Sequence, residues 1–351
     1  MANYVASALA KAQVKASQKF GESETRKKTP SVMGLAVKNA DISIPKPEIE
    51  RVHENRVVDI NYFTSIAAGS DTAKAALHTG SIGDSAKVNL TYNTVVEKFS
   101  IPIKLANNNV YAYEELFANQ WMQHWKNLVS RQDTLALANA ISNRCQLTSA
   151  ALATPVAASG AGDWNQTTYA LEIPYADKNL SVQKAEAFMA ARYFTGSYDV
   201  ISDLQTKSLF EYLVNQGSAN STNTSFQFGS SMITPTQSIV SASYSNGAFL
   251  IMPEGALAGI NWNDKMNKQG INEGQTETGI FTTAEDPFGY GVKADISIYT
   301  KRANTSADTT GGSTQDLLTQ VEMSLTIAYA APPLSTANDG AITLVGIASE
   351  S

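Results

Sequence analysis

The sequence is poor in the residues that most often carry chemistry, with one cysteine and three histidines among 351 residues. The single cysteine, Cys145, excludes an internal disulfide framework and any metal cluster built on cysteines. The histidines, His53, His78 and His124, fall in separate segments, so we expect no shared catalytic or metal site. The sequence also lacks the nucleophile elbow, the zinc-binding helix motif and the phosphate-binding loop. We therefore expect a protein that is not an enzyme and that needs no cofactor.

Charged residues are scarce as well. They make up 17% of the chain, whereas about a quarter is usual in globular proteins. A surface with so few charges is typical of proteins whose outer face is largely buried against neighbouring molecules. The stretch between Glu211 and Glu254 has no charged residue at all and is rich in Ser, Thr and Asn. Its composition predicts a segment that needs neighbouring subunits to order it.

Long apolar runs are also missing. No stretch reaches the ~18 apolar residues of a membrane-spanning helix, and residues 1–17 lack the apolar centre of a secretory signal. We therefore expect a protein that has no membrane partner and that stays in the cytoplasm in which it is made.

What the sequence does have is a basic N-terminal segment on an acidic chain. The first 30 residues carry a net charge of +4, whereas the remainder carries −10. The basic side chains of this segment are Lys11, Lys15, Lys19, Arg26, Lys27 and Lys28. They fit either a solvated end or an arm that contacts acidic partners such as phosphate, a scaffold or a neighbouring subunit. Apolar spacing predicts an amphipathic helix over residues 3–20, and the proline-containing segment up to residue 51 is expected to be an extended arm outside the core.

Alternating apolar residues predict a long two-stranded ribbon over residues 57–105. The alternation runs over residues 58–62, stops at a Gly/Ser/Thr/Ala-rich stretch, and resumes over 88–105 with a change of face near Asn93. A change of face in a period-2 pattern indicates a bulge or a strong twist. Because a two-stranded ribbon is marginal alone in water, we expect this one to pack on an adjacent subunit. The expected contacts are Tyr92, Phe99 and Ile101.

A long helix is predicted over about residues 113–141, and we expect it to lie in the core beneath packed strands. Glu114 and Glu115 favour its N-terminus because of the helix dipole. Its predicted apolar face consists of Tyr113, Phe117, Trp121, Trp125, Leu128, Leu135, Ala138 and Ile141. Cys145 follows this helix and is expected to be a small buried hydrophobic residue.

The second half of the sequence predicts a compact α/β unit and several strands. Residues 148–180 are expected to be loop-like. A helix over 182–194, a strand over 198–202 and a helix over 204–216 follow, with Asp203 as the N-cap of the last helix. Further strands are predicted over 248–252, 295–300, 321–329 and 342–347. The Glu285-Asp286 pair and the Gly289-Tyr290-Gly291 run are expected to be turns.

This order of elements resembles the major capsid proteins of tailed bacteriophages, which have the Hong Kong 97-type fold. The most specific local matches are the runs at 198–204, 226–231 and 246–257. The resemblance covers the whole chain and implies an α+β fold of four parts. These are an N-terminal arm (1–56), an extended β-ribbon or E-loop (57–105), a P-domain with the long spine helix (106–180 and 281–351), and an α/β A-domain (181–280).

The resemblance further implies a subunit that self-assembles into hexamers and pentamers of an icosahedral head. The head would enclose double-stranded DNA without sequence specificity, and portal, scaffolding or decoration proteins would be its other partners in the virion. In such a shell we expect the uncharged segment to lie near the symmetry axes, with Phe226 and Phe228 among the intersubunit contacts. Two alternatives stay open: an encapsulin-like bacterial compartment shell, and a β-rich surface adhesin or glycosidase.

Overall fold

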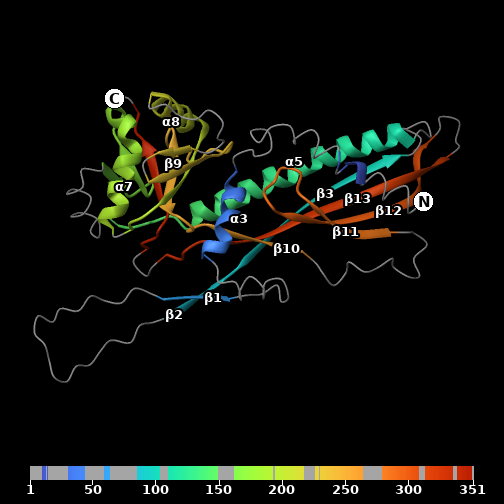
Figure 1. Cartoon of the computed structure of the whole chain (residues 1–351), viewed down its shortest axis with the longest axis horizontal. Helices are drawn as coiled ribbons and strands as arrows, with labels where there is room; N and C mark the ends of the chain where they lie inside the picture. Colours follow the sequence, from blue (N-terminus) through green and yellow to red (C-terminus); the bar gives the residue numbers. More distant parts are fainter. Residues whose placement is uncertain are drawn as a thin grey trace, which may run out of the picture.

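The computed structural model of the chain describes residues 10–12, 14, 31–43, 59–63, 85–102, 110–148, 162–192, 194–216, 226–228, 230–263, 279–307, 313–334 and 338–349. Within these residues the fold is a mixture of helices and antiparallel and mixed sheets, as the α+β prediction requires. Figure 1 shows a compact lobe at one end, an elongated sheet with a long helix along it, and a narrow ribbon that leaves the body. Most of the predicted N-terminal helix lies outside the described residues, since only residues 10–12 and 14 of it are included.

The elongated part is a five-stranded antiparallel sheet whose longest strand is β13. Its strands are β3 (Thr91–Pro102), β13 (Ser313–Ala330), β12 (Lys293–Ala307), β11 (Gly279–Glu285) and β10 (Ala258–Trp262). Strand β3 pairs with one edge of β13, while β12 and then β10 follow one another along the other edge. The two hairpin strands β11 and β12 are joined by a turn at Asp286, whose carboxylate accepts backbone N–H groups from Phe288, Gly289, Tyr290 and Val292. The predicted turn is therefore confirmed.

The predicted long helix is confirmed as α5 (Val110–Ser142), which packs on β3 and β13 along one face of this sheet (Figure 1). Its first half buries four aromatic rings, each at most 1% exposed: Tyr113, Phe117, Trp121 and Trp125. The centroids of successive rings lie 6.0 to 6.4 Å apart, a spacing at which tilted and edge-on contacts are favourable. These rings form the centre of the core between α5 and the sheet.

The second half of α5 buries a different face from the predicted one. Leu135 and Ile141 are only half-buried, and Ala138 is exposed. The residues buried there are Gln132, Asp133, Ala136, Leu137 and Ala140. The prediction failed because two of these are polar, and a pattern built on apolar side chains skips them.

The prediction of an extended arm up to residue 51 is wrong for the helix α3 (Val32–Ser43). Its residues Val32, Met33 and Ala36 have no exposed area and belong to the same core as α5. The prolines at 30 and 45 stand on either side of the helix, so they bound it and do not break it. Figure 1 shows α3 where the lobe meets the elongated sheet.

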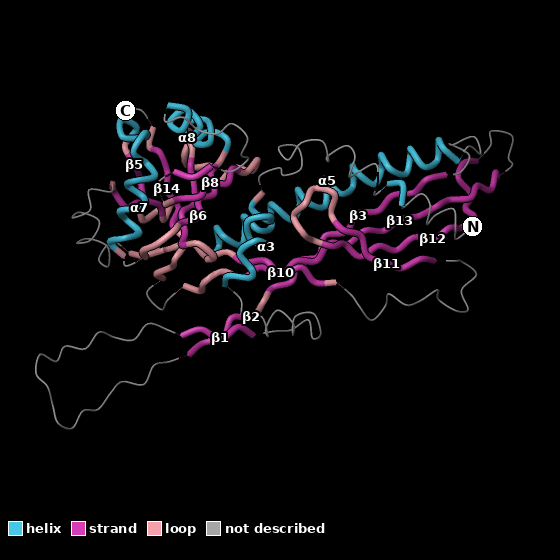
Figure 2. Tube along the Cα trace, viewed as in Figure 1, coloured by secondary structure: helices cyan, strands magenta, loops and turns pink. Residues whose placement is uncertain are grey.

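The lobe is a seven-stranded mixed sheet with helices on one face. Its strands, in spatial order, are β4 (Asp163–Asn165), β5 (Ala170–Ile173), β14 (Thr343–Ile347), β9 (Ala248–Pro253), β6 (Tyr198–Ser202), β8 (Ser231–Pro235) and β7 (Phe226–Phe228). Its helices are η2 (Tyr175–Leu180), α7 (Ser181–Ala191) and α8 (Leu204–Gln216). Figure 2 shows these helices around the lobe's strands. The predicted helices and strands between 182 and 252 are thus confirmed, and the Asp203 carboxylate caps α8 by accepting the N–H of Thr206 at 2.8 Å.

Both faces of the lobe sheet are buried, which explains why its strands are almost wholly apolar. One set of alternate residues, including Val200 and Phe249, packs under α7 and α8. The other set, including Ile201 and Leu250, joins the core that continues under α5. One core therefore runs from the lobe into the elongated part.

Two segments lie in a different sheet from the one predicted. Residues 163–173, expected to be loop-like, contain β4 and β5, and the late strand β14 lies between β5 and β9 in the lobe. The resemblance places both segments in the P-domain, and the sheet pairing places them in the lobe instead. Strand partners so far apart along the chain leave no mark on the local pattern. The remaining domain boundaries stay predictions.

The predicted ribbon is shorter than 57–105. Strands β1 (Asp59–Phe63) and β2 (Ser85–Asn89) pair antiparallel and form a two-stranded sheet of their own. The run after residue 90 is β3, which belongs to the five-stranded sheet. The change of face near Asn93 is therefore neither a bulge nor a twist within one ribbon, since the chain passes from one sheet to another at Leu90. No helix among the described residues is long and apolar enough to cross a membrane.

Candidate functional site

Reactive side chains do not gather at any one place in the described part of the chain. No group of three or more His, Cys, Asp or Glu residues is arranged there to hold a metal ion. Cys145 is a free cysteine buried in the core under α7, as expected. His53 and His78 lie outside the described residues. The candidate functional sites are therefore surfaces.

The first candidate surface is the ribbon of β1 and β2. Within the described residues these two strands pair only with each other, and Figures 1 and 2 show them standing away from the body. The outer edge of each strand consequently presents backbone N–H and C=O groups that no other described strand satisfies. Exposed strand edges of this kind are templates for pairing with another chain.

The root of the ribbon is fixed to the body by a small hydrophobic cluster. Leu90, between β2 and β3, is 9% exposed and packs with Ala258, Ile260 and Ala328. These residues alternate with those that face α5, so the cluster lies on the opposite face of the sheet. The half-buried Tyr92, Trp262 and Ala330 pack around it. The ribbon is therefore attached to the body through a packed hydrophobic base on the five-stranded sheet.

The predicted contact residues fall in different places. Phe99 and Ile101 are 7% and 2% exposed because they pack under α5, so the premise that this strand has no intrachain core is wrong. Tyr92 lies half-buried at the ribbon's root. Phe226 and Phe228 belong to β7, at one edge of the lobe sheet, and their side chains lie outside the described part. Sequence alternation alone does not distinguish a strand that a helix covers from one that a neighbour covers.

Of the six basic residues of the N-terminal segment, only Lys11 is described. Its ammonium pairs with the carboxylate of Glu114 at the start of α5, and the next residue, Ala12, is fully buried. This pair holds Lys11 on the chain's own surface. The other five residues lie outside the described part: Lys15, Lys19, Arg26, Lys27 and Lys28.

The second candidate surface is the face of the five-stranded sheet opposite α5. Along β3 its exposed side chains are Thr94, Val96, Lys98 and Ser100. They are bonded across to β13: the hydroxyls of Thr94 and Thr326 lie 2.9 Å apart, and Lys98 pairs with Glu322 at 2.8 Å. The described part of this face is therefore polar, and its two ion pairs, Lys98–Glu322 and Lys293–Glu285, are made inside the subunit.

An ion cluster ties α5 to β3 at the edge of this sheet. Glu97 accepts hydrogen bonds from Arg131 at 3.0 Å and lies 2.9 Å from Nδ1 of His124, whose ring stacks on Phe99 with centroids 4.9 Å apart. Burial acts to raise the pKa of Glu97, but the hydrogen bonds from His124, Arg131 and Asn127 outweigh it, so the pKa lies below its usual value. The cluster ties the helix α5 to the strand β3.

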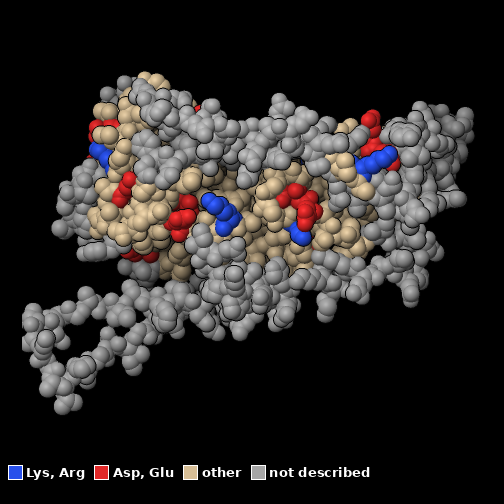
Figure 3. Space-filling view, viewed as in Figure 1, with Lys and Arg blue, Asp and Glu red and all other residues tan. Residues whose placement is uncertain are grey.

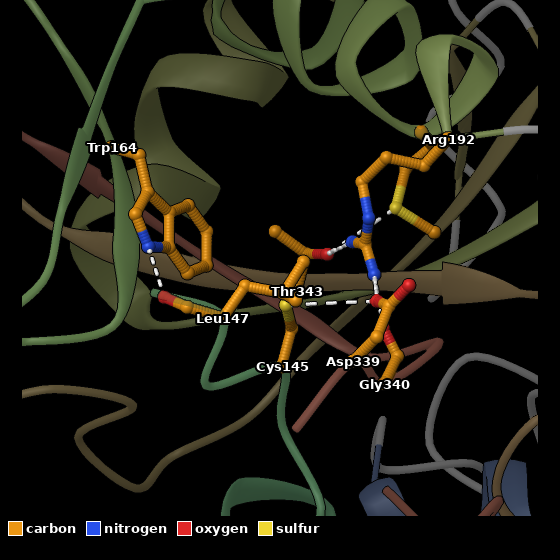
Figure 4. Close-up of polar contacts among 8 residues, drawn as sticks. Cys145, Leu147, Trp164, Arg192, Asp339, Gly340 and Thr343 are labelled. Carbon is orange, nitrogen blue, oxygen red and sulfur yellow. Dashed lines mark hydrogen bonds and ion pairs between the residues drawn. The ribbon is translucent and has the colours of Figure 1, made fainter. Parts of the chain in front are cut away.

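A second tie secures the last strand of the lobe. Figure 4 shows Arg192, at the end of α7, reaching toward Asp339, Gly340 and Thr343. Its guanidinium donates to the carbonyl of Gly340 at 2.7 Å and to the hydroxyl of Thr343 at 3.0 Å, and it pairs with the Asp339 carboxylate. Arg192 thus fixes the turn from which β14 enters the sheet.

The third candidate surface is the outside of the lobe. Three large apolar side chains are well exposed there: Leu204 and Tyr212 on α8, and Ile239 after β8, at 54%, 60% and 74%. On the face drawn in Figure 3, the charged side chains of the described residues form a few small groups and no extended patch of one sign. This lobe surface is suited to contacts made by apolar and neutral polar groups.

No protein-family model matches the sequence, and no curated protein matches it. Solved structures resemble the chain over most of its length, at low sequence identity. A structure from Mycobacterium phage Che8 is 9% identical with a TM-score of 0.46, over 88% of this chain and 90% of that chain.

Two further structures are described as capsids. That of cyanophage P-SCSP1u has a TM-score of 0.40 at 10% identity, over 84% of each chain. The capsid asymmetric unit of cyanophage Pam1 has a TM-score of 0.42 at 9% identity, over 84% of this chain and 86% of that chain.

Proposed function

We propose that this protein is a shell-forming subunit, the major capsid protein of a tailed bacteriophage. Its copies would form hexamers and pentamers of an icosahedral head that encloses double-stranded DNA. The observation that carries the proposal is the ribbon of β1 and β2. A two-stranded ribbon is marginally stable in water, yet this one stands away from the body on a packed base. A neighbouring copy that lies beside the ribbon would supply the strand pairing that no other described strand supplies.

The uncharged stretch between Glu211 and Glu254 supports the same function. A subunit that occurs in both hexamers and pentamers must pack the same surface in two ways. A buried ion pair that is mismatched in one of the two packings leaves a costly lone charge, whereas hydroxyl and amide groups rearrange at little cost. The uncharged stretch over residues 212–253 forms much of the lobe, and we propose that the lobe lies nearest the symmetry axes.

The assembly state tests this function directly. The purified full-length chain should sediment as a particle of megadalton size, and negative-stain microscopy should show closed shells. Tyr62→Pro places a proline inside β1, where Tyr62 pairs with Ala86, and proline disrupts strand pairing. Since β1 and β2 pair with no other described strand, this variant should keep the body folded with an unchanged thermal midpoint but fail to form shells.

Gln123→Ala is the control variant, since Gln123 is exposed on α5 and its loss should leave assembly intact. A chain that stays monomeric under all conditions would contradict the shell function, as would a Tyr62→Pro variant that assembles normally. The contents of the shells decide between two kinds of shell. Nuclease-protected DNA in shells from infected cells supports a capsid, whereas a co-purifying enzyme inside them supports the encapsulin-like alternative.

A further inference from the structure

The helix α3 is held at both ends by buried carboxylates that come from different parts of the fold. At its start, Oδ1 of Asp133 on α5 accepts the backbone N–H of Met33 at 3.0 Å. Toward its end, Asn39 donates from Nδ2 to Oδ2 of Asp199 on β6 at 2.7 Å. Asp133 belongs to the elongated part and Asp199 to the lobe, so one short helix connects the two.

The start of α3 is unusually well satisfied. The first N–H groups of a helix have no partner within it, but here Val32 and Met33 donate to Asp133, and Gly34 donates to the hydroxyl of Ser31 at 2.8 Å. The Asp133 carboxyl group also lies at the N-terminal end of the helix, where the helix dipole favours a negative charge. The hydrogen bonds at the start of α3 are therefore made to side chains that lie outside the helix.

Both carboxylates also bind the lobe or its connection to the sheet. Oδ2 of Asp133 accepts the hydroxyl of Thr236, which follows β8 in the lobe, at 3.3 Å. Oδ2 of Asp199 accepts the N–H of Gly255 at 3.3 Å. Gly255 lies in the turn where the chain passes from β9 in the lobe to β10 in the elongated sheet. The same two carboxylates thus hold α3 and the joint between the sheets.

The apolar contacts of α3 point the other way, toward the elongated sheet. Ala36 packs on Gly259 of β10 so closely that a Cβ at Gly259 would lie 3.2 Å from it, and the ring of Tyr290 lies against Gly34. The helix packs extensively on β10 and α5 but only slightly on β8. Its grip on the lobe is therefore mainly polar, and it depends on the Asn39–Asp199 hydrogen bond.

A cavity beside the joint leaves room for movement. Its volume is about 440 Å³, and it is lined by Ser31, Ser130 and Asp133 near α3, by Gln237 and Ser238 of the lobe, and by Phe288 and Tyr290 of the β11–β12 turn. Side chains from both sheets thus face each other across open space, next to the carboxylate that holds the start of α3.

From these contacts we propose that α3 is a detachable brace that sets the angle between the lobe and the elongated sheet. When the Asn39–Asp199 bond and the Asp133 contacts open, α3 leaves as a unit, because a helix of 12 residues is marginal alone in water. Both sheets keep their own ladders, the shared core next to α3 is loosened, and the lobe then turns about the β9–β10 connection. While α3 is bound, the lobe has one fixed angle to the elongated sheet. After α3 detaches, the lobe samples a range of angles. This device does not depend on shell formation, and it operates in the isolated full-length chain.

Native-state hydrogen exchange and a distance measurement test the brace together. Asn39→Ala removes the donor to Asp199 and should speed exchange of the α3 amides at least tenfold. The amides of β9 and β13 should change less than twofold, since both strands keep their ladders. Spin labels at Gln123→Cys on α5 and Gln205→Cys on α8, both exposed positions, should give a broader distance distribution in the variant. Cys145 is buried and stays unlabelled under native conditions.

Two further variants keep the test decisive. Thr236→Val preserves side-chain shape and removes the lobe's bond to Asp133 together with the acceptor of the Ser238 N–H, so it should shift the same observables in the same direction by a smaller factor. Gln183→Ala changes an exposed residue of α7 and should shift neither by more than twofold. The brace is refuted if α3 exchanges only together with β9 and β13, or if the distance distribution stays as narrow in Asn39→Ala as in the parent chain.

Discussion

The ring of Tyr244 lies directly on Gly346 in the strand β14. A Cβ added at Gly346 would come within 2.5 Å of three atoms of that ring, which real Cβ atoms do not tolerate. The phenol hydroxyl of Tyr244 lies 2.9 Å from the Glu172 carboxylate and 2.7 Å from the Thr168 hydroxyl. Because these bonds fix the ring, it cannot move aside for a larger residue.

Gly346→Ala should therefore destabilise the chain by about 1–3 kcal/mol, the usual cost of overpacking a core. Urea unfolding gives this number. The combination Gly346→Ala with Tyr244→Leu should cost less than the sum of the two single changes by at least about 0.5 kcal/mol, since residues in contact couple. Strictly additive costs would show that the ring is not what excludes the methyl group.

A buried glutamine on α5 should matter more than any exposed one. Gln132 is fully buried and donates from Nε2 to the carbonyls of Asn93 and Leu325, at 2.8 and 2.7 Å, and Tyr329 donates back to it. Gln132→Leu leaves these buried groups unsatisfied and should lower the free energy of unfolding by about 2–4 kcal/mol. The same change at exposed Gln123 should stay within about 0.5 kcal/mol. Equal effects at both positions would contradict this assignment.

The pH dependence of stability should reveal the charge state at the joint. Burial raises the pKa of Asp133 above its ordinary value, and the hydrogen bonds from Met33, Val32, Thr236 and Ser31 offset this only in part. A carboxyl that binds its proton more tightly in the folded chain makes the free energy of unfolding fall as pH rises from the unfolded pKa, about 4, to the folded one. In Asp133→Asn the side-chain oxygen can still accept the backbone N–H groups of Val32 and Met33. The new NH2 group can donate to the hydroxyl of Thr236. Its stability relative to the parent should therefore improve between pH 4 and pH 7.

Glu97 should show the opposite trend and serves as the control. Its pKa is held below the usual value, so it contributes stability above the unfolded pKa that is lost as the pH falls through the folded pKa. Glu97→Gln should therefore be more destabilising, relative to the parent, at pH 7 than at pH 3. Urea midpoints measured across this range give both trends, and parallel curves for the two variants would contradict the opposite directions assigned to them.

The basic N-terminal segment should act in assembly and not in folding. Changing Lys15, Lys19, Arg26, Lys27 and Lys28 to Gln leaves the Lys11–Glu114 pair intact, so the thermal midpoint should stay within about 2 °C. Loss of five cations should reduce the DNA retained by shells and make assembly less sensitive to salt, because each phosphate contact releases counterions. Lys178→Gln in the lobe is the control. Shells with unchanged DNA content and salt dependence would show that the segment is merely solvated.

Helices and strands could be predicted where residues near to them in sequence determine their ends. The strand at 198–202 and the helix at 204–216 match β6 and α8 because Asp203 marks the helix start with a cap that needs no distant partner. The long helix was predictable from its aromatic residues for the same reason. Its buried second half was not, because Gln132 and Asp133 are buried for hydrogen bonds made to residues about 40 to 200 positions away.

Sheet membership could not be predicted from local pattern. The alternation after residue 88 is real, but only the tertiary structure shows that β3 pairs with β13 and not with the ribbon. The helix α3 was missed because its flanking prolines and charges suggest an extended arm, whereas its own residues are apolar. Of the candidate surfaces, the sequence predicted the ribbon but overestimated its length. The joint held by Asp133 and Asp199 could not be predicted, because no sequence motif marks it.

The position of β14 has a consequence for how the protein is made. This strand, the last that the structure describes, lies between β5 and β9 near the middle of the lobe sheet, and each of its paired residues matches a residue of the parallel strand β5 that lies 174 positions earlier. A ribosome must therefore deliver residue 347 before the lobe can close, and contacts of such long range form slowly. A chain interrupted earlier has a lobe divided at its centre. Residues 343–347 thus complete the lobe sheet, and translation must pass them before this sheet is continuous.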